Sequence, residues 1–362
     1  MRSWARWEAG SMFHLESELP GERLSWPQPA VWYMLARHAM AALCQAHLFQ
    51  AQPQRATLWL PSFFCADVAR ACRPLADVRE YQDDPRWPEP RWNTLQPAPQ
   101  DLVLAVNYFG VRSPEPWDAW RDAHPCVLVE DHTQDAFSAW ARNTTADYVL
   151  CSVRKTFPAP DGAFLHSPRL LPLPPPPPAG DGSGCGMKLT AMLYKRDYLE
   201  GRLPADIKPR YRELQLAGEE RMAQAPIAAI SPFSKTLVAG GFPAMWRERR
   251  QANAQRLLDS LSEWKGADPL YRSWPENHAP FDLPLVFADS GERDRWQQLL
   301  REENIFCPVE WIPETDDTNA ADLASRILSL PLDHRYLPEE MEQIAGVLLS
   351  RSPQAARQGG AS

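Results

Sequence analysis

The sequence predicts an α/β protein with a mostly parallel central sheet flanked by helices, followed by a small C-terminal α+β domain. Three continuously apolar runs lie at residues 101–110, 125–136 and 147–155, separated by spacers long enough for helices. Strands that are apolar on both sides are typical of a parallel sheet with helices on both faces. After Gly266 the pattern changes to short strands that alternate with two helices. The 362 residues are sufficient for two domains with large buried cores.

The N-terminal elements follow from composition and from the positions of proline. Residues 1–29 lack periodicity and contain three prolines, so we expect an arm that packs on another part of the molecule. From Ala30 to about Gln50 a run of helix formers without glycine or proline predicts one long helix. Residues 57–61 and the segment near 78–81 are expected to be strands, with the helical stretch FCADVARACRP between them.

The later elements are read in the same way. Segments 163–165 and 283–287 could add strands, and residues 187–262 are expected to be mostly helical. The C-terminal part is predicted to contain, in order, strand FDLPLVFA, helix ERDRWQQLLREENI, strands FCPVEW and RILSLPL, and helix LPEEMEQIAGVLLSR.

Four boundaries divide the chain. We predict an N-terminal arm at 1–29, a large domain at 30–245, a small C-terminal domain at 246–350 and a frayed tail at 351–362. Within the large domain, residues 168–186 join a polyproline run to a glycine-rich stretch and are expected to form a loop or lid. A role as a PxxP ligand is the less favoured interpretation, because exposed proline runs in enzymes are usually insertions.

Charge and cysteine usage exclude several classes of protein. There are 38 basic and 46 acidic residues, and a net charge of −8 disfavours binding to nucleic acid through a general electrostatic field. No apolar segment approaches the length that crosses a bilayer, and no signal peptide is recognised, so we expect a soluble, cytoplasmic protein without a membrane partner. The seven cysteines form no CxxC pair, which predicts neither a disulfide framework nor a metal site; they are residues 44, 65, 72, 126, 151, 185 and 307.

Polar side chains follow each of the three apolar runs, at the sheet edge where ligands of such folds bind. Asn107, Asp131 and Lys155 are among them. A lysine and a carboxylate at one edge could meet two needs of pyridoxal phosphate (PLP): an amine for a Schiff base and an acid beside the pyridine nitrogen. Taken alone, however, Asp131 is as readily a helix cap, and Lys155 a solvated surface residue.

The surrounding sequence favours the first interpretation. VLVEDHTQDAF followed by ADYVLCSVRKTFPAPDGAFL resembles the DegT/StrS-type aminotransferases, whose pattern is an apolar strand, Glu-Asp-x-x-Gln, Ala-Asp-Tyr, Ser and Lys. The resemblance implies a fold-type I PLP-dependent transferase. It extends over nearly the whole chain through LARHAM (35–40), LPSFFCADV (60–68), VNYFG (106–110), NIFCPVEW (304–311) and ILSLPLDHRYLPEEMEQI (327–344).

The resemblance also implies site residues. Lys155 would be the catalytic residue that carries the cofactor, Asp131 would pair with the pyridine nitrogen and Gln134 would bind the ring hydroxyl. Ser152 and the backbone around Ala36 and Arg37, at the start of a helix, would bind the cofactor phosphate. Phe63 or Phe64 could stack on the ring, although the matching position could also be Cys65, and a core phenylalanine is the preferred interpretation.

Three features depart from the family pattern. The small glycine of its phosphate motif is Ala36 here, which requires that the backbone at this position does not need a positive φ. The spacing from Ser152 to Lys155 is shorter than in the sugar aminotransferases of the family. Those enzymes also bring a Gly-Tyr-Asn-x-Arg stretch from a neighbouring subunit; it is not found here, and AISPFSK (229–235) is the nearest polar candidate.

The function expected from this resemblance is transfer of an amino group from an amino acid to a keto sugar, nucleotide-linked, or to a related cyclic ketone, in amino sugar biosynthesis. Two alternatives stay open: a PLP enzyme with another reaction in secondary metabolism, and a catalytically silent binding or scaffold subunit. The resemblance implies a homodimer, and Arg37 and Arg154 are expected to flank the cofactor site. Arg249 and Arg250 could reach a substrate anion, but a solvated helix face is the preferred interpretation.

Overall fold

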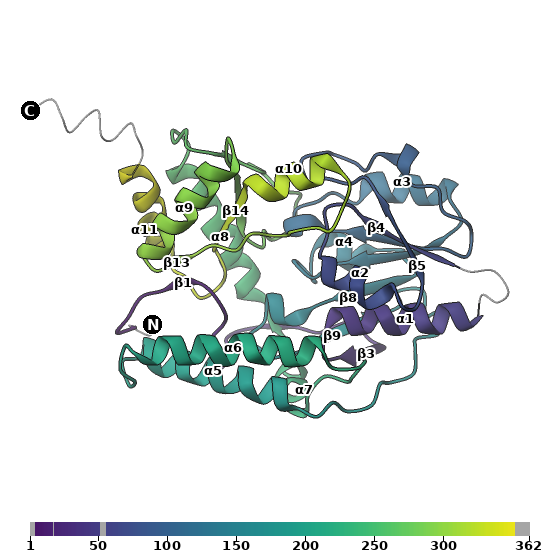
Figure 1. Cartoon of the computed structure of the whole chain (residues 1–362), viewed down its shortest axis with the longest axis horizontal. Coiled ribbons are helices and arrows are strands. Elements are labelled where there is room, and N and C mark those ends of the chain that lie inside the picture. The colour runs from purple at the N-terminus through teal and green to yellow at the C-terminus, as the bar shows by residue number, and fades with distance from the viewer. Residues whose placement is uncertain (1–3, 17, 51–55, 352–362) are drawn as a thin grey trace, which may run out of the picture.

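The large core is built on a seven-stranded sheet (Figure 1). The computed structural model describes residues 4–16, 18–50 and 56–351 of the chain. The strand order of the sheet is β3-β9-β8-β7-β6-β4-β5. The five strands from β8 to β5 are parallel, while β9 is antiparallel to both of its neighbours. The strands are β3 (Ala30–Tyr33), β4 (Thr57–Pro61), β5 (Asp77–Tyr81), β6 (Leu102–Val106), β7 (Val127–Asp131), β8 (Tyr148–Cys151) and β9 (Ala163–His166). The predicted, mostly parallel α/β sheet is confirmed.

Helices cover this sheet and continue beyond it. The central strands β4 and β6 are fully buried, which explains why their sequences are continuously apolar. The helices are α1 (Ala36–Gln50), α2 (Ala66–Cys72), α3 (Glu115–Ala123), α4 (Ala139–Asn143), α5 (Ser183–Leu199), α6 (Ile207–Ala223), α7 (Pro232–Ala239) and α8 (Ala244–Ser260). Short 3-10 turns lie at η1 (Trp92–Thr94), η2 (Tyr108–Gly110) and η3 (Val153–Lys155).

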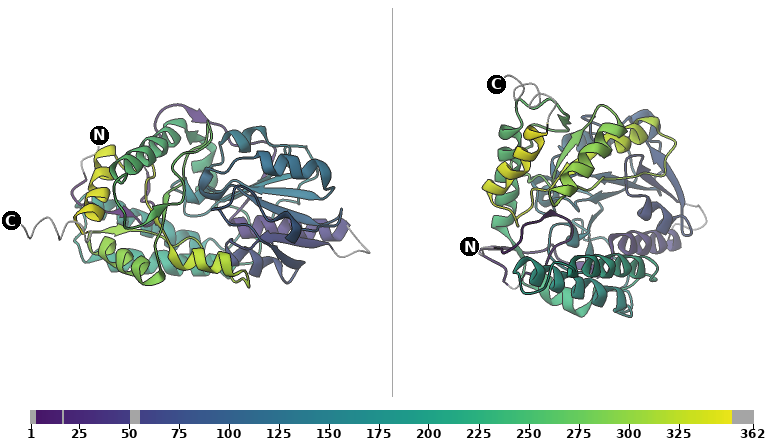
Figure 2. Two further views of the ribbon diagram at one scale, coloured as in Figure 1. Left: turned by 90° about the horizontal axis from the view of Figure 1, so that it is seen from above. Right: turned by 60° about the vertical axis from the view of Figure 1, so that its left-hand side comes forward.

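The C-terminal elements form a second core. An antiparallel sheet of order β11-β12-β14 packs with α8, α9 and α11 around Leu285, Trp296, Leu328 and Ile344, all of which are buried. These elements are β11 (Asp268–Pro269), β12 (Leu283–Val286), α9 (Ser290–Glu302), β13 (Ile305–Phe306), α10 (Thr318–Arg326), β14 (Ile327–Leu330) and α11 (Pro338–Ser350). Figure 2 shows this part, coloured green to yellow, beside the large sheet.

The N-terminal arm packs both on this C-terminal part and on the strand that precedes α8. Strand β1 (Ala9–Gly10) pairs in parallel with β13, and β2 (Arg23–Leu24) pairs antiparallel with β10 (Phe242–Pro243). Gly10 has a φ of 75°, and a Cβ there would lie 2.0 Å from the carbonyl oxygen of Phe306, so this close approach requires glycine. The arm therefore joins regions that are far apart in the sequence.

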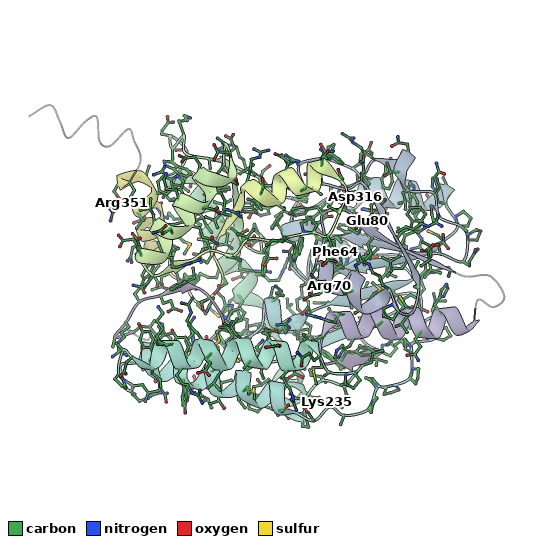
Figure 3. All side chains as sticks on the ribbon, in the orientation of Figure 1. Phe64, Arg70, Glu80, Lys235, Asp316 and Arg351 are labelled. Atoms are coloured by element: carbon green, nitrogen blue, oxygen red, sulfur yellow. The ribbon has the colours of Figure 1, made fainter. Side chains whose placement is uncertain are left out.

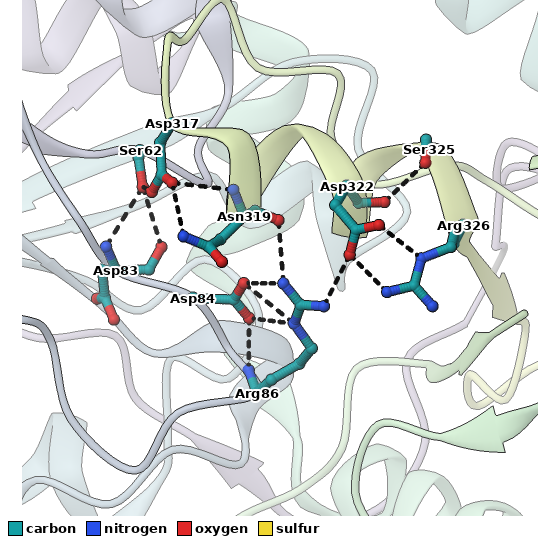
Figure 4. Close-up of polar contacts among 9 residues, drawn as sticks. All are labelled: Ser62, Asp83, Asp84, Arg86, Asp317, Asn319, Asp322, Ser325 and Arg326. Carbon is teal, nitrogen blue, oxygen red and sulfur yellow. Dashed lines mark hydrogen bonds and ion pairs between the residues drawn. The ribbon is translucent and has the colours of Figure 1, made fainter. Parts of the chain in front are cut away.

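Helix α10 joins the two cores through apolar and polar contacts. Its buried residues pack with the large core, although the sequence placed them in the small domain. Figure 4 shows the polar contacts: Ser62 Oγ donates to Asp317 at 2.7 Å, and Arg86 forms ion pairs with Asp84 at 2.6 Å and Asp322 at 3.1 Å. The predicted domain boundaries stay a prediction, and residues 352–362 of the predicted tail lie outside the described residues.

Two predicted elements differ from the structure. The long helix expected from Ala30 begins only at Ala36, because residues 30–33 form β3 and pair with β9. Long-range pairing thus overrides the local helix preference of this segment. The predicted strand FCPVEW is wrong except for Phe306, since β13 ends there and Pro308 has no N–H to donate to a neighbouring strand.

The polyproline segment is anchored rather than detached. Tyr148 donates its hydroxyl to the Pro172 carbonyl at 3.0 Å, and the backbone N–H of Ala229 donates to Pro178 at 2.8 Å. The predicted loop ends at Gly182, because residues from Ser183 onward belong to α5. Throughout the described ranges, no helix is long and apolar enough to cross a membrane.

Candidate active site

Lys155 lies where the resemblance predicts a catalytic lysine, directly after β8 at the carboxyl edge of the sheet. It is the last residue of η3, and its side chain is 39% exposed. Its Nζ atom lies 3.6 Å from Oε1 of Glu310, which comes from the C-terminal part. Lys155 lines a cavity of about 740 Å³. The amine is therefore accessible to a ligand and faces a carboxylate from another domain.

Asp131 ends the neighbouring strand β7 and is fixed by a short chain of hydrogen bonds. Its Oδ1 accepts from the Thr133 N–H at 2.8 Å, and Thr133 Oγ1 accepts from the backbone N–H of Ser152 at 2.9 Å. Burial raises the pKa of Asp131, while the hydrogen bonds from Thr133 and the charge of Lys155 oppose this. The carboxyl edges of β7 and β8 are thus joined, with Asp131 and Lys155 in electrostatic contact.

Gln134 has a satisfied acceptor and an unsatisfied donor. Its Oε1 accepts from the backbone N–H of Phe109 at 2.5 Å. Its Nε2 is buried, and among the described residues it has no hydrogen-bond acceptor. Buried amide donors nearly always have a partner in native proteins, so this donor is suited to an acceptor on a ligand.

Arg250 fixes the Gln134 segment and corrects a prediction. It donates from Nη1 to the carbonyl of Gln134 at 2.8 Å, and its Nη2 lies 3.3 Å from Asp135. Arg247 forms a second ion pair with Asp135 at 2.9 Å. The predicted solvated helix face is therefore wrong for Arg250, which is buried. Arg249 donates to the Tyr336 carbonyl at 3.3 Å.

The predicted phosphate-binding residues lie at the start of α1 and after β8. Helix α1 begins at Ala36, which does not have a positive φ, so the replacement of glycine causes no backbone conflict. Arg37 forms an ion pair with Asp67 at 2.6 Å. No hydrogen bond of the Ser152 hydroxyl occurs within the described ranges. Burial raises the pKa of the Cys65 thiol, and the nearby charges of Lys155 and Arg37 oppose this, so both cations lie near Cys65.

Phe63 and Phe64 pack against the C-terminal part. Their ring centroids lie 5.7 and 5.8 Å from that of Trp311, which also contacts Tyr108 and Phe109. Phe64 is labelled near the middle of the molecule in Figure 3. Both phenylalanines are almost completely buried, in agreement with the preferred interpretation of core residues. No contact in the structure selects either of them as a ring-stacking residue.

A second group of charges lines the same cavity from α5 and α6. Glu219 lies 2.6 Å from Arg154 and 2.5 Å from Lys188. Burial opposes ionisation of Glu219, yet the two cations lower its pKa to about 2. Burial, together with Arg154, lowers the pKa of Lys188 to about 8. This cluster places the predicted Arg154 beside the site and adds a second lysine to its wall.

Sequence reasoning missed eight charged residues of the cavity, among them Lys188, Glu219, Asp282 and Glu310. The last two interrupt apolar runs, in FDLPLVFA and FCPVEW, and a carboxylate inside an apolar run is a signal that could have found them. No such signal marks Lys188 or Glu219, because charged residues are ordinary on helices that face solvent. Within the described residues, no cluster of side chains suited to a metal ion occurs.

Solved structures share this architecture. Spr1654 of Streptococcus pneumoniae, a sugar aminotransferase by its description and solved in its PLP form, is 13% identical over 88% of this chain and 86% of its own, with a TM-score of 0.60. A DegT DnrJ EryC1 StrS aminotransferase from Brucella abortus is 15% identical over 89% and 86%, with a TM-score of 0.55. DesI, solved in the presence of its TDP-sugar product, is 14% identical over 92% and 83%, with a TM-score of 0.56.

The chain has the fold of the DegT/StrS-type aminotransferases. The predicted fold-type I architecture is confirmed, because the similarity covers the large sheet and the C-terminal part together. No family model matches the sequence, and no curated protein sequence matches it significantly. In this aminotransferase fold, Lys155, Asp131 and Gln134 share one sheet edge, and Trp311 and Glu310 bring the C-terminal part against it.

Proposed function

We propose that the protein is a PLP-dependent aminotransferase that moves an amino group from an amino acid to a keto sugar in amino sugar biosynthesis. The observation that carries this proposal is that Lys155, Asp131 and Gln134 lie together at the carboxyl ends of β7 and β8. Of the three, Lys155 lines a cavity large enough for a small substrate. The sugar aminotransferases that share the fold support the reaction class.

The donor and acceptor groups at this edge fit the cofactor. The unpartnered Nε2 of Gln134 is a donor for the ring hydroxyl oxygen, and the Asp131 carboxyl group is suited to the pyridine nitrogen. The Lys155 amine is accessible and makes no hydrogen bond with the described residues. The Ser152 hydroxyl and the first N–H groups of α1 would hold the phosphate. Arg37 is already paired with Asp67, so it contributes its backbone rather than its charge.

When bound, PLP supplies an electron sink that stabilises negative charge on the substrate carbon. Asp131 would hold a proton at the ring nitrogen, and the hydrogen bond from Thr133 fixes the position of its carboxyl group. Lys155 would carry the cofactor and, once released, move a proton at its Nζ atom. Gln134 orients the ring, because its own position is fixed by Phe109 on one side and Arg250 on the other.

We propose a phosphorylated or nucleotide-linked sugar as the acceptor. Arg212 on α6 and Arg301 on α9 line the cavity, and neither has an acidic partner within 4 Å among the described residues. Along α6, Arg212 is seven residues from Glu219, which lies at the Lys155 end, and this corresponds to about 10 Å. An anionic group would therefore bind about two helical turns from the reacting amine.

We also propose a cytoplasmic homodimer. The only cation that the predicted phosphate site receives from α1 is Arg37, whose charge is neutralised by Asp67, so a cation from a second subunit would complete the site. Leu216 and Ile312 are apolar and 69% and 78% exposed, which suits an interface. All seven cysteines are free, as expected in a reducing compartment. Sedimentation of the active, cofactor-loaded protein tests the dimer; an active monomer would contradict it.

Reductive fixation of the cofactor tests the proposed function. The protein is reconstituted with PLP, reduced with borohydride and digested, and the labelled peptide is identified by mass spectrometry. We expect yellow protein and a label on Lys155 for the wild type and for Lys235→Ala, which removes an exposed lysine of α7 (Figure 3). Lys155→Ala should lose the label, the colour and the formation of the pyridoxamine form with amino acids.

Lys188 is the internal rival in this experiment, because it lines the same cavity. A label on Lys188 in the wild type, or full turnover by Lys155→Ala, would remove Lys155 from the mechanism. A colourless wild-type protein that cannot be reconstituted would favour the binding or scaffold subunit.

A further inference from the structure

Two buried carboxyl groups face Lys155 from the C-terminal part of the molecule. Asp282 directly precedes β12 and Glu310 lies four residues after β13, and both line the 740 Å³ cavity. They are 4% and 7% exposed. Both oxygens of Asp282, and Oε2 of Glu310, lack a hydrogen bond of good geometry among the described residues, although the Ser329 hydroxyl lies close to Asp282. Three acceptor oxygens are therefore unsatisfied at one place on the cavity wall.

The surroundings of Asp282 favour its protonated form. Burial and then the charge of Glu310 raise the pKa of Asp282 well above its usual value. Ser329, Lys155 and Arg250 oppose this, but less strongly. Repulsion between two adjacent buried carboxylates therefore adds to the effect of burial on Asp282.

Lys155 is the cation that lies nearest to the two carboxyl groups. In the part of the chain that the structure describes, no other lysine, arginine or histidine nitrogen lies within 4 Å of either carboxyl group. Under the proposed function, the cofactor engages the amine of Lys155. A buried carboxylate whose cation is engaged elsewhere is strongly unfavourable, and a replacement cation would stabilise it.

The other acidic groups of the cavity are already neutralised. Asp333 lies 2.8 Å from Arg335, and Glu219 lies within 2.6 Å of both Arg154 and Lys188. The place beside Asp282 and Glu310 is therefore where a cationic group of a ligand would be favoured, even though Arg212 and Arg301 make the opposite part of the cavity positive.

We infer that Asp282 and Glu310 form a subsite for an ammonium group that the substrate carries near its reacting carbon. An ammonium group has three donors, which matches the three unsatisfied oxygens, whereas a hydroxyl group brings one donor and no charge. The keto substrate is then one that already carries an amino group near its reacting carbon. This inference rests on the proposed function for the engagement of Lys155, but the subsite itself can be tested without the cofactor.

The test uses Lys155→Met, which removes the cation without removing the bulk of the side chain. Binding of 2-deoxystreptamine, a diamino cyclitol, and of myo-inositol, a neutral cyclitol, is measured by titration calorimetry at pH 7 on the full chain. We expect the diamine to bind Lys155→Met on the order of tenfold more tightly than the wild type, because the cation competing for Glu310 has gone. Myo-inositol should show no such gain.

Proton release distinguishes a charged ligand from a hydroxylated one. When the ammonium group binds, Asp282 should lose its proton to the buffer, so the apparent enthalpy should depend on the ionisation enthalpy of the buffer. Adding Asp282→Asn or Glu310→Gln to Lys155→Met should abolish the gain in affinity, and Asp282→Asn should also abolish proton release. Glu302→Gln, an exposed carboxylate on α9, is the matched control and should change neither.

Several results would overturn the subsite. These are equal affinity of the diamine for Lys155→Met and wild type, equal gains for myo-inositol, or an unchanged gain after Glu310→Gln. If Asp282→Asn does not fold, Glu310→Gln carries the test alone. If the wild type cannot be loaded with PLP but Lys155→Met binds the diamine more tightly, the proposed function fails and the subsite stands. If the wild type is loaded with PLP but Lys155→Met binds the diamine no more tightly, the proposed function stands and the subsite fails.

Discussion

Glu8 is the residue whose loss should most clearly detach the N-terminal arm. It is 7% exposed, and its carboxylate lies 2.8 Å from Nζ of Lys195 and 2.6 Å from Nζ of Lys208, while Tyr211 donates to it at 3.1 Å. Lys195 is completely buried, and it also donates to the Met12 carbonyl at 2.7 Å. Replacing Glu8 by glutamine leaves a buried ammonium group without its counter-ion.

The expected loss can be bounded from the charges. Removing one partner of a buried ion pair costs about 3–5 kcal/mol. In the wild type, burial already lowers the pKa of Lys195 to about 8 despite Glu8. We therefore expect Glu8→Gln to lose about 3–5 kcal/mol of unfolding free energy at pH 7.

The pH dependence gives a sharper check. A lysine whose pKa is lower in the folded state destabilises the fold below that pKa, and the penalty decreases as the pH rises toward the unfolded value of 10.5. The loss caused by Glu8→Gln should therefore shrink between pH 7 and pH 10. Glu8 itself has its pKa lowered to about 2, so its contribution in the wild type is present above about 4.5 and is lost on acidification toward 2.

Urea unfolding of Glu8→Gln, of Lys195→Met and of the double variant measures these energies. The double variant should recover most of the loss, because only Lys208, which is partly exposed, is then left without its partner. Cleavage by trypsin after Arg6 should be faster in Glu8→Gln, since the arm carries this residue. A loss below about 1 kcal/mol, or a loss that stays constant from pH 7 to 10, would refute the reasoning.

Three further predictions concern the site and the contact between the cores. Asp131→Asn should keep the cofactor bound but lower kcat by about a hundredfold or more, because an uncharged pyridine is a weaker electron sink; steady-state kinetics and a cofactor titration compare the two effects. Gln134→Leu should cost about 1–3 kcal/mol, seen by thermal melting, because it leaves the Phe109 N–H unsatisfied, and it should weaken cofactor binding about tenfold. Asp317→Ala, which removes the N-cap of α10 and the acceptor for Ser62, should cost about 1–2 kcal/mol in urea unfolding; an unchanged midpoint would show that this contact is not stabilising.

Most of the sheet could be predicted from the sequence because its central strands are buried on both faces. Strand β4 has the predicted bounds of 57–61, and β6, β7 and β8 lie inside the predicted apolar runs. Residues 30–33 could not be predicted correctly, because their strand conformation depends on pairing with β9, more than a hundred residues away. Local helix preference alone therefore placed the start of this helix at Ala30, whereas the helix begins at Ala36.

The candidate site divides in the same way. Lys155, Asp131 and Gln134 were expected at one edge because they lie at or just after the ends of parallel strands, whereas their roles came from the family resemblance. Arg250 was misjudged, since its helix carries charges at a spacing typical of a solvated face, and only the packing of α8 against the Gln134 segment buries it. Glu310 and Asp282 come from the other core, and no local pattern states which edge of the large sheet they will face.

By itself, the sequence determined the fold class, the order of the strands along the chain and the residues at their carboxyl ends. These properties follow from which segments are apolar and from the geometry that any parallel sheet imposes on the residues after its strands. The tertiary structure alone decided that the arm packs beside the cavity, that Arg37 is neutralised by Asp67 and that two carboxyl groups face Lys155. Charges interact through space over a few ångströms, and the distances between residues so far apart in the chain are set only when both cores have packed.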